Sequence, residues 1–231
     1  MHEQPLIEHS NRSLIKISAG DGELLLCAAR AAFDPIRRAL YVADVHLGKA
    51  LSFRSLGVPV PGGTTALALT RLGDLIGELR AQTVFILGDL LHGPAVRDSG
   101  VIDQLMRWRH KYSDVRMVLI RGNHDHRAGD PPDRCGIEVI AEGLRDGPWI
   151  LCHESRPEQA GYVLSGHVHP VYRLKGRADS IRLPAFLIGQ RGAVLPAFGE
   201  FTGGSRIAQA PGDRVFVTDG QNVHAVPSVA N

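Results

Sequence analysis

Side chains that can bind metal ions follow apolar segments at five places in this chain. The clearest is M-V-L-I-R-G-N-H-D-H at 117–126, where an apolar run stops at Gly122 and is followed by Asn123, His124 and Asp125. An apolar, β-branched run of this length is typical of a buried strand. In open α/β sheets, ligands bind at the carboxyl ends of the strands, so this cluster is predicted to lie at a binding edge.

The same arrangement occurs four more times. The polar residues that follow the other apolar runs are Asp44 and His46, then Asp89, then His153, then His167 and His169. If the strands are neighbours in one sheet, all of these groups converge at one edge. Any single one of them could instead be a helix cap, a turn residue or a hydrogen-bonded core group. The motifs G-N-H-D and G-H-x-H are more specific, because no helix or sheet rule requires histidine there.

The ligand types and their spacing predict a site for two divalent ions. Carboxylate, imidazole and amide oxygen ligands together suit Mn, Fe, Zn or Co. The candidate ligands are Asp44, His46, Asp89, Asn123, His153, His167 and His169. This set is larger than one ion needs and suits two ions that share a carboxylate. His46 and His169 each stand two residues from another candidate, so both members of a pair can point to the same side of an extended segment.

Hydrophobic periodicity predicts the elements that position these groups. Strands are expected at 14–17, 24–27, 39–43, 83–87, 118–120, 137–141, 149–152 and 162–164, the first two joined by a turn at 20–22. One helix is expected from Thr64 or Thr65, as its N-cap, to about Arg80, and another from Asp98, as its cap, to Lys111.

The remaining segments are rich in glycine and proline. Residues 47–63 are expected to form a loop that carries Lys49 and Arg54, and 129–134 a surface loop. After Val171, short apolar runs alternate with turn residues, which predicts antiparallel hairpins at 171–174, 181–188, 193–195, 214–217 and 222–225. We see no linker, so residues 1–231 are expected to form one domain.

Composition limits the function classes. The 231 residues are 44% hydrophobic and 22% charged, as in a globular protein with a sizeable core. The net charge of +2 neither argues for nucleic acid nor excludes it. Cys27, Cys135 and Cys152 form neither a disulfide framework nor a CxxC zinc site, which favours a reducing cytosol. The start, M-H-E-Q-P-L-I-E-H, lacks a signal-peptide pattern, and no apolar stretch reaches the ~18 residues of a membrane span, so we expect a soluble, cytoplasmic protein.

Taken in order, these motifs resemble those of the calcineurin-like metallophosphoesterase superfamily. The motifs are D-x-H at 44–46, G-D at 88–89, G-N-H-D at 122–125, the single His153, and G-H-x-H at 166–169. The resemblance implies an α/β fold, a four-layer metallophosphoesterase sandwich of two mixed β-sheets flanked by helices.

The resemblance also implies a role for each residue. Asp44, His46 and His169 would bind one metal ion, Asn123, His153 and His167 the other, and Asp89 would bridge both. His124 would be a catalytic histidine that binds no metal, close to the leaving group and oriented by Asp125.

Three outer motifs resemble a narrower group. They are H-L-G-K at 46–49, F-R-x-x-G-x-P-V-P-x-G-T-T at 53–65 and L-P-A-F-G-x-F-T-G-G at 195–204. They are similar to small bacterial enzymes associated with a DNA ligase and a large helicase in DNA-repair operons. That subgroup is associated with manganese-dependent phosphodiesterase and DNA endonuclease activity. Single-stranded DNA or DNA ends are then the expected substrate, and Mn²⁺ the expected cofactor.

The predicted reaction is hydrolysis of a phosphodiester bond. Two ions ~3.5–4 Å apart bind the nonbridging oxygens and turn a shared water into hydroxide near neutral pH. Our hypothesis is in-line attack by that bridging hydroxide, with His124 assisting the leaving oxygen. Arg54 is predicted to contact phosphate, since guanidinium matches its geometry, although it could equally be a solvated loop residue. His92 and His126 flank ligand segments and are predicted to be supporting or surface groups.

Other functions stay open at this stage. A small-molecule or cyclic-nucleotide phosphodiesterase or phosphatase is the main alternative. Purple acid phosphatases place tyrosine three residues after the bridging aspartate, where this chain has His92. Protein phosphatases usually have Glu after G-N-H, and Asp125 at that position favours diesterases. A non-catalytic binding scaffold on the same fold is the distant alternative, disfavoured by the complete ligand set.

Overall fold

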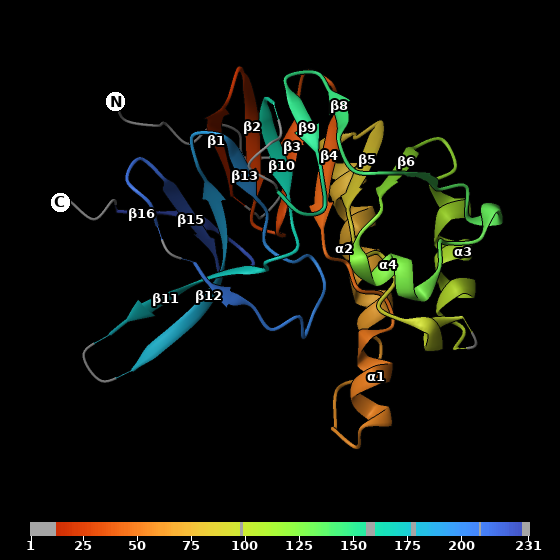
Figure 1. The fold of residues 1–231 in the computed structure, drawn as a ribbon. Coiled ribbons are helices and arrows are strands. Elements are labelled where there is room, and N and C mark those ends of the chain that lie inside the picture. Colours follow the sequence, from red (N-terminus) through yellow and green to blue (C-terminus); the bar gives the residue numbers. More distant parts are fainter. Residues whose placement is uncertain (1–12, 98, 156–159, 177–178, 208, 228–231) are drawn as a thin grey trace.

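Two mixed β-sheets face each other in the computed structural model, which describes residues 13–97, 99–155, 160–176, 179–207 and 209–227 (Figure 1). The strands of the first sheet are, in spatial order, β1 (Leu14–Ala19), β2 (Gly22–Cys27), β3 (Ala31–Asp34), β4 (Ala39–Ala43), β5 (Thr83–Leu87), β6 (Arg116–Ile120) and β7 (Glu138–Ile140). Strands β1 to β4 pair antiparallel, and β4 to β7 pair parallel. The carboxyl ends of β4, β5 and β6 therefore lie at one edge.

The second sheet takes its strands from the C-terminal part of the chain. They are β8 (Leu144–Asp146), β9 (Trp149–Leu151), β10 (Tyr162–Ser165), β11 (Pro170–Lys175), β12 (Ser180–Ile188), β13 (Gly192–Val194), β14 (Ser205–Arg206), β15 (Arg214–Thr218) and β16 (Val223–Val226). Strand β10 pairs parallel with both β9 and β13. The antiparallel hairpin of β11 and β12 projects from the sheet, and we call it the arm (Figure 1).

In the described part of the chain, four α-helices and two short 3₁₀ helices lie between residues 49 and 135. They are α1 (Lys49–Ser55), α2 (Thr64–Leu79), α3 (Val101–Lys111), α4 (Asn123–Ala128), η1 (Pro94–Val96) and η2 (Asp133–Cys135). Apolar side chains one turn apart, such as Leu69, Leu72 and Ile76, give α2 a buried face against the first sheet. None of the described helices is both long and apolar enough to cross a membrane.

The side chains of the central strands point alternately to the two faces of the first sheet, and they divide the interior into two main cores. Leu40 and Val42 of β4 belong to the core beneath the helices, whereas Tyr41 and Ala43 belong to the core between the sheets. Successive side chains of a strand point to opposite faces, so a strand buried on both faces reads as one continuous apolar run. The predicted sandwich of two mixed sheets with helices packed outside is confirmed.

Several local predictions were wrong. Residues 49–55, expected in a loop, form α1. The prediction missed this seven-residue helix because the glycines on either side of it are typical of a loop. Helix α2 begins after Gly63 without a side-chain cap, and the Thr65 hydroxyl instead accepts a hydrogen bond from the Gly48 N–H (3.3 Å). Helix α3 begins at Val101, and its expected cap, Asp98, lies outside the described residues.

Candidate metal centre

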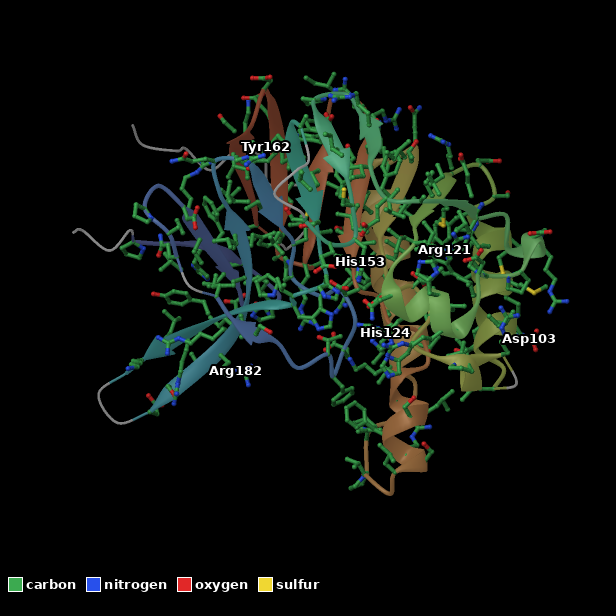
Figure 2. All side chains as sticks on the ribbon, in the orientation of Figure 1. Asp103, Arg121, His124, His153, Tyr162 and Arg182 are labelled. Carbon is green, nitrogen blue, oxygen red and sulfur yellow. The ribbon has the colours of Figure 1, made fainter. Side chains whose placement is uncertain are left out.

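The predicted ligands converge at the edge where both sheets end. Asp44 follows β4, Asp89 follows β5 and Asn123 begins α4 after β6. His153 follows β9, and His167 and His169 follow β10, so these three come from the second sheet. The expectation that one sheet carries all of them was therefore wrong: the strand ends of two sheets meet. Figure 2 shows both His153, which follows β9, and His124, which lies on α4, at this shared edge.

Most of these residues adopt an unusual backbone conformation. Left-handed φ angles occur at Asp44 (53°), His46 (49°), Asp89 (54°), His167 (69°) and His169 (47°). Such a conformation costs of order 1–3 kcal/mol for a residue other than glycine and persists only where the surrounding structure enforces it. The Asp44–His46 and His167–His169 pairs thus do not lie on extended segments as expected. Sharp backbone turns aim each side chain individually.

The first group of ligands joins Asp44, His46 and His169. The Nε2 atoms of His46 and His169 are 3.3 Å apart, and His169 Nε2 is 3.4 Å from Asp44 Oδ1. Asp44 and His46 are almost completely buried. Because their three ligand atoms lie within 4.8 Å of one another, one cation could contact all of them.

The second group joins Asn123, His153 and His167. His153 Nε2 lies 3.0 Å from Asn123 Oδ1 and 3.0 Å from His167 Nδ1. The carboxylate of Asp89 stands between the two groups. Its Oδ1 is 3.6 Å from His153 Nε2, and its Oδ2 is 3.8 Å from His46 Nε2. Asp89 is the residue whose two oxygens face both groups.

Hydrogen bonds to backbone carbonyls decide which histidine nitrogens face the centre. His153 Nδ1 lies 3.1 Å from the Leu87 oxygen, and His169 Nδ1 lies 3.0 Å from the Thr202 oxygen. A carbonyl oxygen only accepts, so each Nδ1 must donate, and the Nε2 lone pair of each neutral ring points into the cluster.

The cluster is rich in acceptors and poor in donors. Among the described residues, the buried Oδ1 of Asp44 has no hydrogen-bond partner. Its contact with His169 Nε2, at 3.4 Å, is an ion-pair contact and not a hydrogen bond. Lone pairs of His153 and Asn123 face each other across 3.0 Å. Buried acceptors without donors are costly unless a cation joins them. The donor set therefore fits divalent metal ions.

Burial and nearby positive charge favour the neutral form of two histidines at the centre, His46 and His92. Burial and the nearby Lys49 ammonium lower the pKa of His46 far below its usual range. Burial, with the charges of Lys49 and His124, lowers the pKa of His92 to about 4. Neutral imidazole is the form that binds metal. Lys49 is half-buried near these rings, and sequence reasoning placed it only within a loop motif.

His124 is held beside the ligands but is oriented differently from the expectation. Its backbone N–H donates to Asp89 Oδ1 (2.9 Å), and its Nδ1 donates to the His92 carbonyl oxygen (2.7 Å). Its ring stacks on His92, with the ring centroids 4.8 Å apart and an interplanar angle of 19°. Nε2 is therefore the nitrogen left to meet a substrate.

Asp125 has a structural task instead of orienting the His124 ring. Its carboxylate accepts backbone N–H bonds from Asp89 (2.7 Å), Leu91 (3.1 Å) and Gly122 (2.9 Å). Burial raises the pKa of Asp125 to about 6, although these three donors favour the ionised form. By accepting the hydrogen bond from the Asp89 N–H, Asp125 helps to fix the position of Asp89.

The remaining predicted residues lie outside the ligand groups. Arg54 is exposed, and its guanidinium donates to the carbonyl oxygens of Val60 (3.5 Å) and Pro61 (3.0 Å), which ties α1 to the following turn. His126 is exposed and lines a hollow of about 350 Å³ beside Asn123. Cys152 is buried with Ile150 and Val163, as expected of a core residue.

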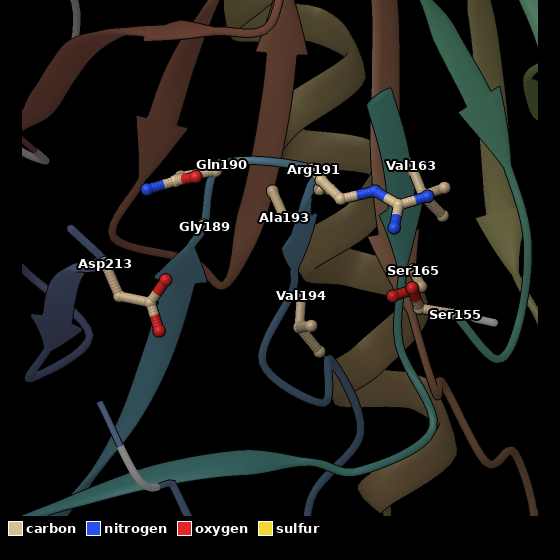
Figure 3. Close-up of a pocket in the computed structure, with 10 residues that line it drawn as sticks. Ser155, Val163, Ser165, Gly189, Gln190, Arg191, Ala193, Val194 and Asp213 are labelled. Atoms are coloured by element: carbon tan, nitrogen blue, oxygen red, sulfur yellow. The ribbon is translucent and has the colours of Figure 1, made fainter. Parts of the chain in front are cut away.

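A second hollow lies beside β10 and β13. It has a volume of about 390 Å³ and is bordered by Ser155, Ser165, Arg191 and Asp213 (Figure 3). None of the predicted site residues lines it.

Comparison with known proteins finds similarity to phosphoesterases and to a nuclease. The family model of the calcineurin-like phosphoesterases matches residues 37–156. The crystal structure of the nuclease MPE from Pseudomonas putida is 41% identical, covers 93% of this chain and 100% of its own, and has a TM-score of 0.83. YfcE, a phosphoesterase from E. coli, is 18% identical over 81% of this chain and 97% of its own, with a TM-score of 0.41. No curated protein matches significantly.

Proposed function

The chain belongs to the calcineurin-like phosphoesterase family, and we propose that within it the protein is a two-metal phosphodiesterase that cleaves DNA. Metal-dependent hydrolysis of a phosphoester is what the family and the similarity to a nuclease support directly. The observation that carries the finer proposal is the placement of Asp89, whose two carboxylate oxygens face two separate ligand groups.

The proposal assigns each ligand to one of two ions. Asp44, His46 and His169 hold the first, Asn123, His153 and His167 hold the second, and Asp89 contacts both. Nitrogen and oxygen ligands of this mixture suit Mn²⁺, with Fe, Zn or Co as alternatives. When bound, the ions would bind the nonbridging phosphate oxygens and lower the pKa of water. Because each group draws on both sheets, we propose that the sheets act as one metallophosphoesterase domain.

His124 supplies the proton in this proposal. The His92 carbonyl accepts the Nδ1–H, so the protonated ring presents its Nε2–H to a leaving oxygen. The bond from the His124 N–H to Asp89 keeps the ring at a set position relative to the ligands. His92 stacks against the ring and restricts its rotation.

DNA is proposed as the substrate from two supports. The chain is 41% identical to a nuclease over most of its length, and the three outer motifs resemble those of small DNA-repair enzymes. A functional association with a DNA ligase and a helicase is proposed from the second support alone, and a cytoplasmic location is proposed from the three free cysteines.

Metal restoration tests the proposed reaction. The protein is stripped with chelator, and manganese, magnesium, zinc or cobalt is restored singly with bis(p-nitrophenyl) phosphate or p-nitrophenyl phosphate as substrate. We expect diester hydrolysis to return with manganese and to exceed monoester hydrolysis. Turnover of the monoester alone would make the protein a phosphatase. Two bound ions without turnover of either substrate would make it a binding scaffold.

A further inference from the structure

A cavity of about 310 Å³ opens beside His169, where the arm leaves the second sheet. Its lining includes Arg30, His169, Arg182, Glu200, Phe201 and Thr202, and we call it the arm-side cavity. His169 directly precedes β11, so one wall of the cavity is a predicted metal ligand. A molecule that binds at the metal centre can therefore extend into this cavity.

Phe201 is an exposed aromatic ring held in a strained loop. Its side chain is 43% exposed, and its backbone φ is +57°, which is unusual for a bulky residue. Phe198, three residues earlier, is 0% exposed and packs under the Arg71 guanidinium at 4.2 Å. The two rings thus have opposite surroundings, and only Phe198 is explained by packing.

The strained loop is tied directly to the metal centre. The Thr202 carbonyl accepts the hydrogen bond from His169 Nδ1 at 3.0 Å, one residue after Phe201. On the other side, Glu200 pairs with Arg71 at 2.7 Å and with Arg30 at 3.5 Å. The Phe201 ring is therefore presented from a loop that is anchored on both sides of it.

Arg182 makes the arm-side cavity attractive to an anion. It stands exposed on β12, and in the described part of the chain its hydrogen bond is to the Gly204 carbonyl (2.7 Å). A guanidinium has five N–H donors, so most remain available. The one carboxylate in the lining, Glu200, is already neutralised by two arginines. Figure 2 shows Arg182 on the side of the centre away from His124.

The hollow on the other side of the centre has different chemistry. It is lined by Asn123, His126, Glu142, Glu154 and Arg121, with no phenylalanine, tyrosine or tryptophan. The Arg121 guanidinium is committed to the Asp130 carboxylate through two contacts of 2.8 and 2.5 Å. Two carboxylates and a paired arginine do not favour a polyanion, so the arm-side cavity is the better nucleotide site.

We propose that the arm-side cavity binds a nucleotide adjacent to the scissile phosphate of a single-stranded nucleic acid, with its base stacked on Phe201 and a phosphate on Arg182. The proposal rests on the proposed function, because it needs the scissile phosphate at the metal centre. Aromatic side chains that stack on bases and arginines that track phosphates are the usual means of binding single strands. A base paired within a duplex does not offer its face to Phe201, so the cavity selects unpaired strands.

Substitution of Phe201 separates this role from catalysis. We compare Phe201→Ala, Phe201→Trp and Arg182→Ala on a single-stranded oligonucleotide and on bis(p-nitrophenyl) phosphate, with manganese. Phe201→Ala is expected to raise KM for the oligonucleotide about 5- to 100-fold and to leave the small diester within about twofold. Phe201→Trp should restore the KM. The control is Leu67→Ala, which removes an exposed apolar side chain on α2.

Three outcomes would overturn the proposal. Equal losses on both substrates would make Phe201 a support of the His169 loop, and an unchanged KM for the oligonucleotide would exclude stacking. Preference of the wild-type protein for duplex over single strands would also contradict it.

Photo-crosslinking detects the contact by a readout other than turnover. Oligonucleotides that carry 5-iodouracil at one position are irradiated with the manganese-loaded wild-type protein, and the modified residue is mapped by mass spectrometry. We expect modification of Phe201, lost in Phe201→Ala. Crosslinks elsewhere in a protein that hydrolyses diesters would overturn the nucleotide site and leave the proposed function intact. Crosslinks at Phe201 without diester hydrolysis would overturn the proposed function and keep the site.

Discussion

The metal centre and the arm-side cavity share His169 but are held in place in opposite ways. In the centre, Asp44 is 0% and Asp89 2% exposed, and their left-handed backbone is enforced by hydrogen bonds between strand ends. In the cavity, Phe201 and Arg182 are exposed. The Phe201 loop is held by the Thr202 carbonyl and the Glu200 ion pairs, and Arg182 donates to the Gly204 carbonyl.

This contrast indicates a division of labour. Groups that need exact spacing are built into the ends of two packed sheets, where the surrounding core enforces a strained conformation. Groups that need to adapt to a flexible strand lie on the rim. Changes in the centre should therefore remove all turnover, and changes in the cavity should affect only nucleic acids.

The largest effect is expected from Asp89→Ala. Loss of the carboxylate that faces both ligand groups should lower hydrolysis of bis(p-nitrophenyl) phosphate and of oligonucleotides alike, by about 10³-fold or more. The number of metal ions per chain, measured by inductively coupled plasma mass spectrometry, should fall below two. Asp74→Ala, an exposed carboxylate on α2, is the matched control. If only the hydrolysis of oligonucleotides fell, Asp89 would have a role in binding nucleic acid and not in the metal centre.

His124→Ala should come next. The ring donates from Nδ1 to His92 and leaves Nε2 for the substrate, so its removal should lower kcat on both substrates about 10²- to 10⁴-fold. Metal content should stay at that of the wild type. His110→Ala, exposed on α3, serves as the control. Loss of metal in His124→Ala would make this residue a ligand and refute the proton role.

Metal binding should raise the stability of the folded protein, and this gain should depend on the metal centre and not on the arm-side cavity. Manganese at about 100 times its Kd should add about 2.7 kcal/mol to the free energy of unfolding. For a chain of this size, that raises Tm by roughly 5–10 °C relative to the chelated protein. The shift should disappear in Asp89→Ala and persist in Phe201→Ala, as measured by thermal unfolding. An unchanged Tm in the wild type would mean that the acceptor cluster binds no manganese.

A smaller effect is expected from Arg182→Ala. If one phosphate contact is lost, the slope of log K against log salt concentration for a single strand should fall by about 0.7. Binding should weaken uniformly across sequences, since phosphate contacts carry no sequence information. Fluorescence anisotropy measures both, with Arg107→Ala on α3 as the control. A sequence-dependent loss would place Arg182 on a base.

The smallest effect is expected from Arg54→Ala. The guanidinium serves the carbonyls of Val60 and Pro61, so small-diester hydrolysis should change less than about threefold. Steady-state kinetics with bis(p-nitrophenyl) phosphate decide the matter. A tenfold or larger fall in kcat would instead support the phosphate contact that the sequence predicted for Arg54.

The ligand positions could be predicted because each one interrupts an apolar run. Val118 to Ile120 must be buried, and Asn123 must then emerge at the end of the strand, whatever the rest of the fold does. The same reasoning applies to Asp44 after β4 and to Asp89 after β5. Helix α2 was predictable for a related reason, since its buried face repeats with the period of a helix.

The orientation of the site histidines could not be predicted in the same way. His124 donates to a carbonyl 32 positions away, and His169 to one 33 positions away, so their tautomers depend on tertiary contacts. The left-handed φ of Asp89 is unfavourable by local rules and survives because Asp125 and the sheet ends hold it. Phe201 has no periodic signal that separates it from Phe198.

The most direct test of the account is the number and position of the bound ions. Crystals grown with manganese are measured at the manganese absorption edge, where anomalous scattering locates each ion. The account predicts two peaks on either side of the Asp89 carboxylate, ~3.5–4 Å apart, one contacting His46 and His169 and the other His153 and His167. A single peak, or peaks away from Asp89 in a protein that hydrolyses diesters, would contradict it.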